Sequence, residues 1–422
     1  FVLVMLGSIL ANYGFGLWVD ACKRAGRTCL PPLVAALAVN LGILFVFKYL
    51  TFTLGILNRL GAAFVIPGIE LPIGISFFTF QGLSYVIDVY RGDAAVQRDP
   101  LKLALYIAFF PQLVAGPIVR YTTVAEEIDE RHESVSEFSA GAVRFLFGLG
   151  KKMLLANAVA RIADAAFAAV MPSVLFAWLG AVAYTFQIYF DFSAYSDMAI
   201  GLGRMFGFHF LENFNYPYVA RSVTEFWRRW HISLSTWFRD YVYIPLGGNR
   251  CSRARNVWNL FVVWFLTGMW HGASWNFIAW GLWFFVLLVG EKLLWGKALE
   301  RLPSLVRHAY AMVLVVFSWV LFRAETLTAA AAYFAAMFGS SGVWCGSRVV
   351  YYSLEFWPEL LCCCIAALPV KQWLETALQK RDAAPARAVL TWGPKLAAMA
   401  LLACSYCKLV TGSFNPFIYF RF

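Results

Sequence analysis

The segment Val257–Gly290, VWNLFVVWFLTGMWHGASWNFIAWGLWFFVLLVG, contains no Asp, Glu, Lys or Arg. As one helix it would be about 51 Å long at 1.5 Å per residue, more than a bilayer core of about 30 Å requires. Gly268 and Gly272 are candidate breaks, so the segment predicts two membrane helices that meet near His271. This stretch indicates an all-α membrane protein.

The composition of the whole chain agrees with this reading. Hydrophobic residues make up 61% of the 422 residues and charged residues 14%, which leaves too few polar side chains to cover a water-exposed surface. We therefore expect one membrane-embedded domain, residues 1–422, without a separate soluble domain. The formal charge of +11 is expected to reflect Lys and Arg in cytoplasmic loops that face anionic lipid. Because no zinc-finger or RNA-binding signature is present, nucleic acid is not an expected partner.

Several other segments reach the length of about 20 mainly apolar residues that a span requires. They are Phe1–Val19, Pro31–Phe52, Leu71–Val89, Leu101–Val119, Phe138–Val159, Met171–Phe190, His308–Phe322, Val350–Val370 and Leu396–Val410. We expect a polytopic protein with about ten transmembrane helices, together with interfacial and re-entrant helices. Phe1–Val19 is uncharged and is followed by Lys23 and Arg24, the reverse of a signal peptide. We therefore expect a span whose upstream sequence is missing.

The stretch Arg221–Arg255 differs because it is rich in arginine. By the positive-inside rule it is expected to face the cytoplasm. Two neighbouring stripes recur at three- and four-residue steps, one apolar with Trp227, Trp230, Leu234, Trp237 and Tyr241, the other polar with Arg228, His231, Ser235 and Arg239. This pattern predicts a helix in the membrane interface, with its tryptophans in the headgroup layer and its arginines toward water.

Among the five histidines, His271 alone lies within a long uncharged apolar stretch. An ionisable group at membrane depth is costly and is a functional candidate by default. Burial among tryptophans should favour the neutral imidazole, the form that a general base requires. The alternative is a core histidine bonded to a backbone carbonyl. His231 lies on the polar stripe, where a solvated interfacial histidine would be ordinary.

Two carboxylates, Asp191 and Asp197, lie near the end of an uncharged span. They are six residues apart and do not share a helical face as an acid–base pair would, so each is expected to hold an arginine or to cap a helix. The sequence has no GxSxG elbow, no HExxH and no Walker loop. Because histidines and cysteines do not cluster, no metal site is expected.

Several motifs are specific enough to indicate a family. FDFSAYSDMAIGL at 190–202, ENFNYPY at 212–218, and the run from TEFWRRWH at 224–231 through WFRDY at 237–241 to IPLGGNR at 244–250 resemble the membrane-bound O-acyltransferase superfamily. FPQLVAGPIVR at 110–120, WHGA at 270–273 and the ending PFIYF at 416–420 are similar to its bacterial alginate O-acetylation branch. The resemblance is dense from about residue 70 to 290.

The resemblance implies a reaction and two site residues. The family's near-universal histidine falls on His271, and its second common polar position falls on His231. The family moves an acyl group from a cytoplasmic thioester, typically acetyl-CoA, toward an acceptor outside the membrane. In this branch the acceptor is usually an extracytoplasmic polysaccharide, and an SGNH-hydrolase-type partner often completes the transfer. The expected location is the bacterial inner, or cytoplasmic, membrane. The chain departs from the family at its start, where a further hydrophobic segment is usual.

This reaction agrees with the residues present. A neutral imidazole at His271 can take the proton of an attacking hydroxyl and later protonate the thiolate. Asn276, or a backbone N–H near Gly272, is a candidate donor to the oxyanion. Arg228, Arg229 and Arg239 either attract the phosphates of coenzyme A or satisfy the positive-inside rule without a ligand.

Other functions stay open at this point. The same fold can transfer D-alanyl groups from a carrier protein to teichoic acid. A transporter or flippase for a lipid-linked sugar would keep working after His271→Ala and would need no thioester. A scaffold that only recruits a partner would leave acetylation unchanged after the same substitution.

Overall fold

The computed structural model describes residues 1–380, 384–412 and 416–418, and all regular structure in these ranges is helical. The α-helices are α1 (Val2–Arg24), α2 (Leu30–Leu44), α3 (Leu50–Arg59), α4 (Ile75–Arg91), α5 (Pro100–Ala108), α6 (Phe110–Leu113), α7 (Tyr121–Asp129), α8 (Val135–Gly150), α9 (Asn157–Phe167), α10 (Val174–Met205), α11 (Val223–Trp227), α12 (Ile232–Phe238), α13 (Arg253–His271), α14 (Trp275–Gly290), α15 (Gly296–Glu300), α16 (Ser304–Arg323), α17 (Leu327–Met337), α18 (Ser347–Ala366), α19 (Val370–Gln379) and α20 (Ala384–Thr411). Shorter turns are the π-helical η1 (Phe45–Tyr49), η2 (Lys151–Ala156), η4 (Arg239–Tyr243) and η5 (Glu291–Trp295), and the 3₁₀ turn η3 (Pro217–Val219). The predicted all-α class is confirmed.

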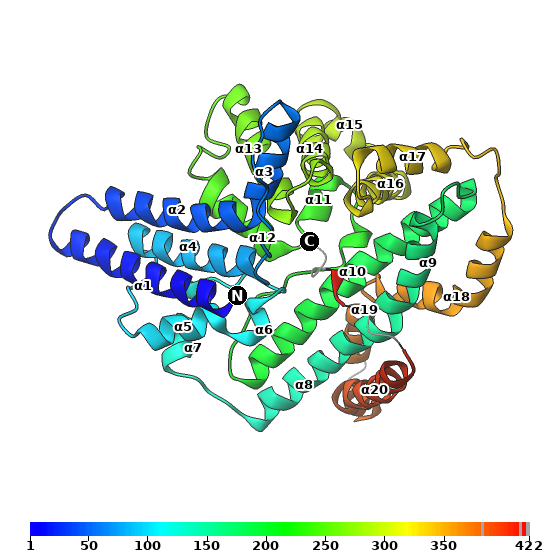
Figure 1. Ribbon diagram of the computed structural model, residues 1–422. Helices are drawn as coiled ribbons and strands as arrows, with labels where there is room; N and C mark the ends of the chain where they lie inside the picture. The colour runs from blue at the N-terminus through cyan, green and yellow to red at the C-terminus, as the bar shows by residue number, and fades with distance from the viewer. Residues whose placement is uncertain (381–383, 413–415, 419–422) are drawn as a thin grey trace.

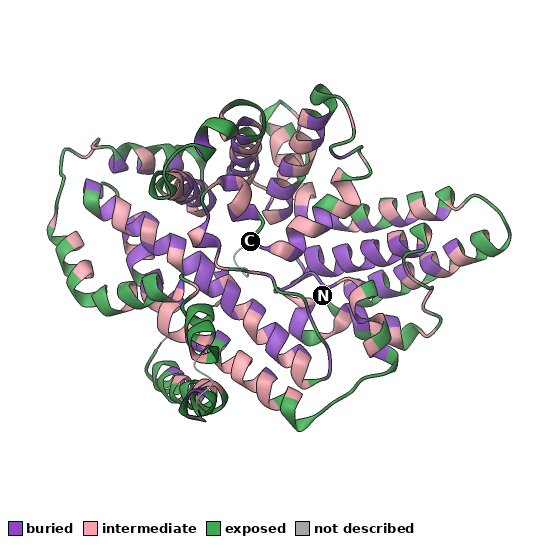
Figure 2. Cartoon of the chain, turned by 180° about the vertical axis from the view of Figure 1, so that it is seen from behind, coloured by how far each residue is buried: buried purple, intermediate pink, exposed green. Residues whose placement is uncertain are grey.

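Within the described ranges, seven helices are long and apolar enough to cross a bilayer. They are Val2–Arg24, Leu30–Arg59, Val174–Met205, Trp275–Glu300, Ser304–Arg323, Ser347–Ala366 and Pro385–Thr411. Buried residues gather at the centre, while outer helices such as α18 and α20 are largely exposed (Figure 2). Their exposed side chains include Leu354, Trp392 and Leu396, as contact with lipid requires. The chain is a polytopic membrane protein, and the count of about ten spans stays a prediction.

The segment Leu101–Val119, expected as one span, forms two short helices instead. Helix α5 ends at Ala108, and Phe109 has an extended backbone with ψ of 114°. Pro111 then lies in the first turn of α6, where its missing N–H costs no helical bond. The proline explains why an apolar stretch of sufficient length does not continue as a single helix.

Helices α1, α2 and α4 lie side by side at one end of the molecule (Figure 1). Asn12 of α1 and Asn40 of α2 exchange hydrogen bonds between their side-chain amides, at 3.0 and 2.9 Å. Gly82 of α4 leaves room for this pair, because a Cβ there would lie 2.4 Å from Asn12 Nδ2. Such paired amides join helices in an apolar environment, where an unpaired amide would be costly.

The long helix α10 packs closely against α8, and both run diagonally through the other half of the molecule (Figure 1). Two glycines of α8 permit this approach. A Cβ at Gly141 would lie 2.5 Å from the carbonyl oxygen of Gly201, and a Cβ at Gly148 would lie 2.7 Å from that of Ala194. The position of α10 therefore depends on small residues in α8.

Replacement of Gly148 by Leu is expected to destabilise the protein by about 1–3 kcal/mol or more, because the new side chain would overlap the α10 backbone. The measurement is the midpoint of thermal unfolding in detergent, followed by size-exclusion chromatography. Gly42→Leu is the matched control, because a Cβ at Gly42 has no heavy atom within 4 Å. Equal midpoints for the two variants would contradict the packing described here.

The predicted break near His271 is confirmed. Helix α13 ends at His271, Gly272 follows with an extended backbone (φ −179°, ψ 159°), and α14 begins at Trp275. Gly268, the other candidate break, lies inside α13 instead. A Cβ at Gly268 would lie 2.4 Å from the carbonyl oxygen of Phe277, so this glycine permits close contact between the two helices. Helices α13 and α14 form a tight hairpin with His271 at its turn.

The interfacial helix predicted for Arg221–Arg255 is wrong as a continuous element. Helix α11 ends at Trp227, α12 begins at Ile232, and His231 between them has a left-handed backbone with φ of 44°. His231 is only 1% exposed, so the polar stripe does not face water at this point. The apolar stripe is buried inside the protein rather than placed in headgroups, as the exposures of Trp227, Trp230, Leu234 and Trp237 show.

Each of the four π-helical turns places a charged side chain against another element. The contacts run from Lys48 to the carbonyl of Trp270, from Lys152 to Asp191, from Asp240 to Arg120, and from Glu291 to the N–H groups of Val223 and Thr224. A π-helical turn carries one residue more than an α-helical turn and is frequent at functional sites. Three of these contacts reach the hairpin, α10 and the α11–α12 segment, which surround the pocket described next.

Candidate active site

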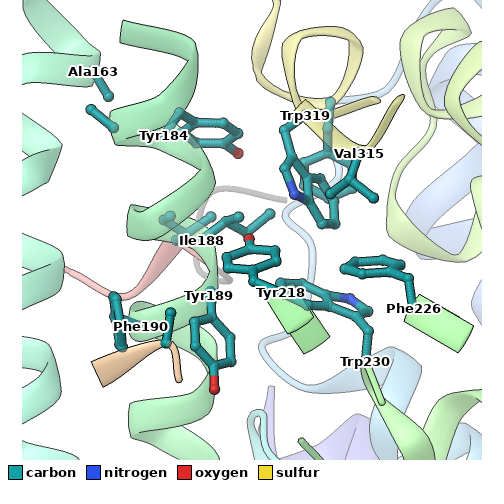
Figure 3. Close-up of a cluster of buried hydrophobic side chains, with 14 of the residues drawn as sticks. Ala163, Tyr184, Ile188, Tyr189, Phe190, Tyr218, Phe226, Trp230, Val315 and Trp319 are labelled. Atoms are coloured by element: carbon teal, nitrogen blue, oxygen red, sulfur yellow. The ribbon is translucent and has the colours of Figure 1, made fainter. Parts of the chain in front are cut away.

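A pocket of about 540 Å³, including its open mouth, lies among α10, the α11–α12 break, the α13–α14 hairpin and α16. Its lining consists of Ala115, Ile188, Asp191, Phe192, Tyr195, Trp230, Trp270, His271, Trp280, Trp319, Phe322, Phe417 and Ile418. Figure 3 shows Ile188, Trp230 and Trp319 of this lining pointing toward one another from three elements. A mainly aromatic pocket with few polar groups is typical of a small-molecule site.

His271 is partly buried and lines this pocket at the end of α13. Its ring is held among aromatic rings, with centroid distances of 5.0 Å to Trp270, 4.9 Å to Trp280 and 5.1 Å to Phe322. All three contacts are edge-on, at angles of 81° to 84°. The residue predicted to be the reaction centre therefore reaches the pocket with its orientation restricted on several sides.

His231 lies just behind the pocket wall. Its ring contacts Phe192 at 4.7 Å and Trp270 at 5.9 Å, two residues that line the pocket. The left-handed turn at His231 is fixed by backbone bonds on both sides, from Ile232 N–H to the carbonyl of Asn213 and from Asn215 N–H to that of Arg229, each 2.9 Å. Both predicted histidines thus contact the same tryptophan, Trp270.

Hydrogen bonds define which nitrogen of His231 carries the proton. The Oδ1 atom of Asn213 accepts the backbone N–H of Ser233 at 3.2 Å, and its Nδ2 donates to Ser196 Oγ at 3.0 Å. Oδ1 is therefore the acceptor for His231 Nδ1, 3.1 Å away, and Nδ1 must be the donor. Nε2 then carries a lone pair, and this buried atom has no hydrogen-bond partner among the described residues.

His231 lies outside the membrane-spanning helices, in the break between α11 and α12. Burial lowers the pKa of its imidazole to about 3, because the charged form loses its hydration. His231 is therefore neutral throughout the physiological pH range.

Asp191 connects the pocket to the C-terminal end of the described chain. Lys152 donates to one carboxylate oxygen of Asp191, and the other oxygen accepts the N–H of Ile418 at 2.7 Å. Lys152 also donates to the carbonyl of Pro416 at 3.1 Å. This buried ion pair holds residues 416–418 against the pocket, with Phe417 and Ile418 in its lining. The sequence led us to expect an arginine or a helix cap here, and the partner is a lysine.

Asp197 was likewise expected to hold an arginine or to cap a helix, and the first of these is confirmed. It pairs with Arg144 at 2.8 Å and with Lys151 at 2.6 Å. These ion pairs tie α8 and η2 to α10. Residues 419–420 of the ending motif PFIYF lie outside the described residues.

The three arginines predicted to attract the donor are not in the pocket lining of the described chain. Arg228 is exposed. Arg229 pairs with Glu225 at 3.0 Å, and Arg239 pairs with Asp240 at 2.6 Å. Two of the three therefore have a carboxylate partner, and a role in donor binding stays a prediction.

Asn276, predicted as an oxyanion donor, lies in the first turn of α14 and is 3% exposed. Its Nδ2 donates to the carbonyl of Ala324, which ties the hairpin to the end of α16. The N–H of Gly272 donates to the carbonyl of Met269 at 3.1 Å. Both candidate donors thus have partners within the protein. In the described ranges no group of three or more His, Cys, Asp and Glu side chains is placed to hold a metal ion.

Sequence reasoning missed two residues that belong to this site. Asn213, which orients His231, lies inside the quoted motif ENFNYPY, but nothing in its spacing connects it to a histidine 18 residues away. Lys48 is buried and donates to the carbonyl of Trp270, directly before His271. The available signal was an ionisable side chain within an otherwise apolar span. Such a residue is costly and is therefore a functional candidate by default.

Comparison with known proteins agrees with the helical membrane fold. The sequence profile of MBOAT, the membrane-bound O-acyltransferase family, matches residues 90–329. The chain is 39% identical to the probable alginate O-acetylase AlgI of Pseudomonas aeruginosa, over 100% of this chain and 91% of that protein. Both His231 and His271 lie within the matched range.

Similarity extends to proteins with other names. The chain is 34% identical to the peptidoglycan O-acetyltransferase of Helicobacter pylori, over 81% of this chain and 70% of the relative. It is 28% identical to the teichoic acid D-alanyltransferase of Bacillus subtilis, over 59% and 67% of the two chains. Together with the seven apolar helices, these matches identify a multi-pass bacterial membrane protein and an acyl-transferring enzyme. The chain belongs to the membrane-bound O-acyltransferase family.

Proposed function

We propose that the protein passes acetyl groups from cytoplasmic acetyl-CoA across the membrane toward hydroxyls of an extracytoplasmic polysaccharide. The observation that carries this proposal is the position of His271 at the turn of the α13–α14 hairpin, in the lining of an aromatic pocket. Relatives named as acetylating alginate and peptidoglycan support an acetyl group and a polysaccharide acceptor. Because those acceptors differ, the proposal names a class of acceptor and not one polymer.

In this proposal His271 is the general base. The acceptor hydroxyl attacks the carbonyl carbon of the thioester while its proton moves to the imidazole, and a tetrahedral intermediate forms. The C–S bond then breaks, the imidazolium returns the proton to the thiolate, and the products are an acetyl ester and free coenzyme A. The mainly aromatic lining limits competing hydrolysis, because it offers few polar partners that would hold an ordered water.

His231 supports this reaction as a second hydrogen-bond acceptor. Its Nδ1–H is held by Asn213, so the unprotonated Nε2 is the atom left to receive a hydrogen bond. Through Trp270 its ring is coupled to the wall that also orients His271. We assign His231 to the orientation of the reacting groups, with His271 as the base.

The oxyanion and the donor phosphates require separate groups. Asn276 donates one amide N–H to the carbonyl of Ala324 and has a second one, so we keep it as a candidate donor to the oxyanion, together with the first-turn N–H groups of α14, which lack helical acceptors. Arg228 is the exposed member of the arginine set, and we propose that it attracts the phosphates of coenzyme A at the cytoplasmic face, with Arg229 and Arg239 adding positive charge. The acceptor hydroxyl belongs either to the polysaccharide itself or to a serine of an SGNH-hydrolase-type partner, which then passes the acetyl group on to the polysaccharide.

The donor can be tested with purified protein in lipid nanodiscs. We expect label from acetyl-CoA to reach the polysaccharide when the partner is present, and no transfer from a D-alanyl-charged carrier protein. Arg228→Ala is expected to raise the KM for acetyl-CoA about three- to tenfold with kcat unchanged, because the lost attraction acts on binding alone. Transfer only from the charged carrier would instead establish the D-alanyl reaction, which the Bacillus subtilis relative performs by name. Movement of a lipid-linked sugar without any thioester would establish a transporter.

A further inference from the structure

Lys48 carries a buried amine for which the proposed reaction has no assigned use. It lies on the π-helical turn η1 and is 8% exposed. Its Nζ donates to Ser76 Oγ at 3.1 Å and to the carbonyl oxygen of Trp270. Among the described residues no carboxylate lies within ion-pair distance of it. A buried cation without a counter-ion costs stability, so its presence requires another explanation.

The same turn makes a second contact with α13. The hydroxyl of Tyr49 donates to the carbonyl of Met269 at 2.8 Å. Consecutive residues of η1 thus hold the two carbonyls that directly precede His271. These carbonyls belong to the last turn of α13, where the helix dipole is negative. The carbonyl of Met269 also accepts the N–H of Gly272, at 3.1 Å. The turn serves as a C-terminal cap that is supplied by another helix.

The indole ring of Trp270 also contacts the amine of Lys48. Lys48 Nζ lies 5.9 Å from the centroid of the Trp270 indole, whose other contacts include both His231 and His271. A lysine that held only a remote helix end would not touch the residue that joins the two histidines. Both the backbone and the side chain of Trp270 are therefore restrained by Lys48.

We infer that Lys48 is a positioning residue for the acyl-transfer site: together with Tyr49 it fixes the end of α13 and so the orientation of His271. This inference rests on the proposed function. The imidazole follows directly on the two carbonyls that η1 holds, so release of the helix end would move the base relative to the pocket. Because misplacement of a base affects the chemical step, we expect substitution of Lys48 to lower kcat and to leave the KM for the donor unchanged.

Lys23 offers a matched control within the chain. Its Nζ donates to the carbonyl of Val89 at 2.7 Å, in the last turn of α4. It is therefore also a lysine on one helix that binds a carbonyl at the end of another. Unlike Lys48, it is exposed and contacts no pocket-lining residue by this bond.

The test compares Lys48→Met, Tyr49→Phe and Lys23→Met by kcat, KM for acetyl-CoA and thermal midpoint. For Lys48→Met we expect kcat to fall about 10- to 100-fold, KM to stay within about twofold, and the midpoint to stay equal or rise. Tyr49→Phe, which removes one neutral bond, is expected to lower kcat about three- to tenfold. Lys23→Met is expected to keep the wild-type kcat.

A second readout does not depend on turnover. The rate at which diethyl pyrocarbonate modifies His271, followed by mass spectrometry, is expected to change in Lys48→Met and not in Lys23→Met. Wild-type kcat in both η1 variants, or loss of kcat only in parallel with a lower midpoint or lower membrane level, would overturn the inference. If the wild type itself transfers no acetyl group, the proposed function fails. If, in addition, His271 is modified at the same rate in Lys48→Met and in the wild type, the positioning role fails as well.

Discussion

Replacement of His271 by Ala is expected to remove surface-polysaccharide acetylation while the protein remains in the membrane at the wild-type level. Loss of a general base lowers a rate by about 10²–10⁴-fold. At the remaining rate we expect no acetylation that a cellular assay can detect. The fold should persist, because the hairpin is held by the close approach at Gly268 and by the bond from Asn276 to Ala324. The measurement is acetyl content of the surface glycan, with membrane levels matched by immunoblot.

His132→Ala is a suitable control for this experiment, because His132 is exposed and lies in the loop between α7 and α8. The His132→Ala variant should acetylate the surface glycan to the wild-type level. Unchanged acetylation in His271→Ala would contradict the general-base mechanism and would favour the transporter or the scaffold. If acetylation is lost, the next step is labelled acetyl-CoA with the purified variant, which separates a failure of chemistry from a failure of delivery.

The second large effect is expected at His231. His231→Ala should lower kcat about 10- to 100-fold, because the neutral Nε2 acceptor near Trp270 is lost. Asn213→Leu should have a similar effect with the histidine still present, since Nδ1–H loses its acceptor and the tautomer is no longer fixed. Ser196→Ala removes only the bond that Asn213 Nδ2 donates, and a smaller loss is expected.

The pH dependence of kcat gives a separate test of the role of His231. Burial lowers the pKa of His231 to about 3, so this residue is neutral from pH 5 to 9 and does not titrate in that range. His231→Ala should therefore lower the kcat–pH curve without moving its midpoints. A shifted midpoint in this variant would show that His231 carries a titrating proton in the reaction. The profile should be recorded at saturating acetyl-CoA, so that donor binding does not contribute.

The sequence was most informative where a single physical requirement decided the outcome. Val257–Gly290 is too long for one crossing, so its length required a break, and the glycines at 268 and 272 placed that break near His271, as α13 and α14 confirm. The helical class and the membrane setting followed from composition in the same way. For Asp197, one of the two expected roles, a pair with an arginine, is the one observed, because a carboxylate in an apolar span requires a cation.

The site geometry depended on features that periodicity does not show. Trp227, Trp230, Leu234 and Trp237 keep a helical repeat across the break at His231, so the pattern predicted a continuous interfacial helix. The break depends on a left-handed residue that is not glycine and that is stabilised by backbone bonds to residues 213–215. Such tertiary hydrogen bonds carry no local signal. The stripe pattern therefore placed His231 among solvated residues, and only the family resemblance marked it as a site residue.

Lys48 illustrates a second limit. A charge near the end of an apolar segment is usually interpreted as a side chain that extends to the membrane surface. In this structure Lys48 lies in a π-helical turn, which alters the direction of the side chains within the span, and its amine reaches the end of α13. No propensity distinguishes that turn from the α-helix on either side of it.

The π-helical turns have a consequence for how homologous chains should be aligned. Each turn holds one residue more than the α-helix it interrupts, and one residue corresponds to about 100° of rotation around a helix axis. A one-residue gap inside a transmembrane span is commonly treated as an alignment error and closed. Opposite Phe45–Tyr49 or Glu291–Trp295, which lie inside two of the candidate spans, such a gap would instead mark a homologue that has lost the turn. In such a homologue, a residue aligned with Lys48 would face another direction. Even a lysine at that position of the alignment would then not make the same contact.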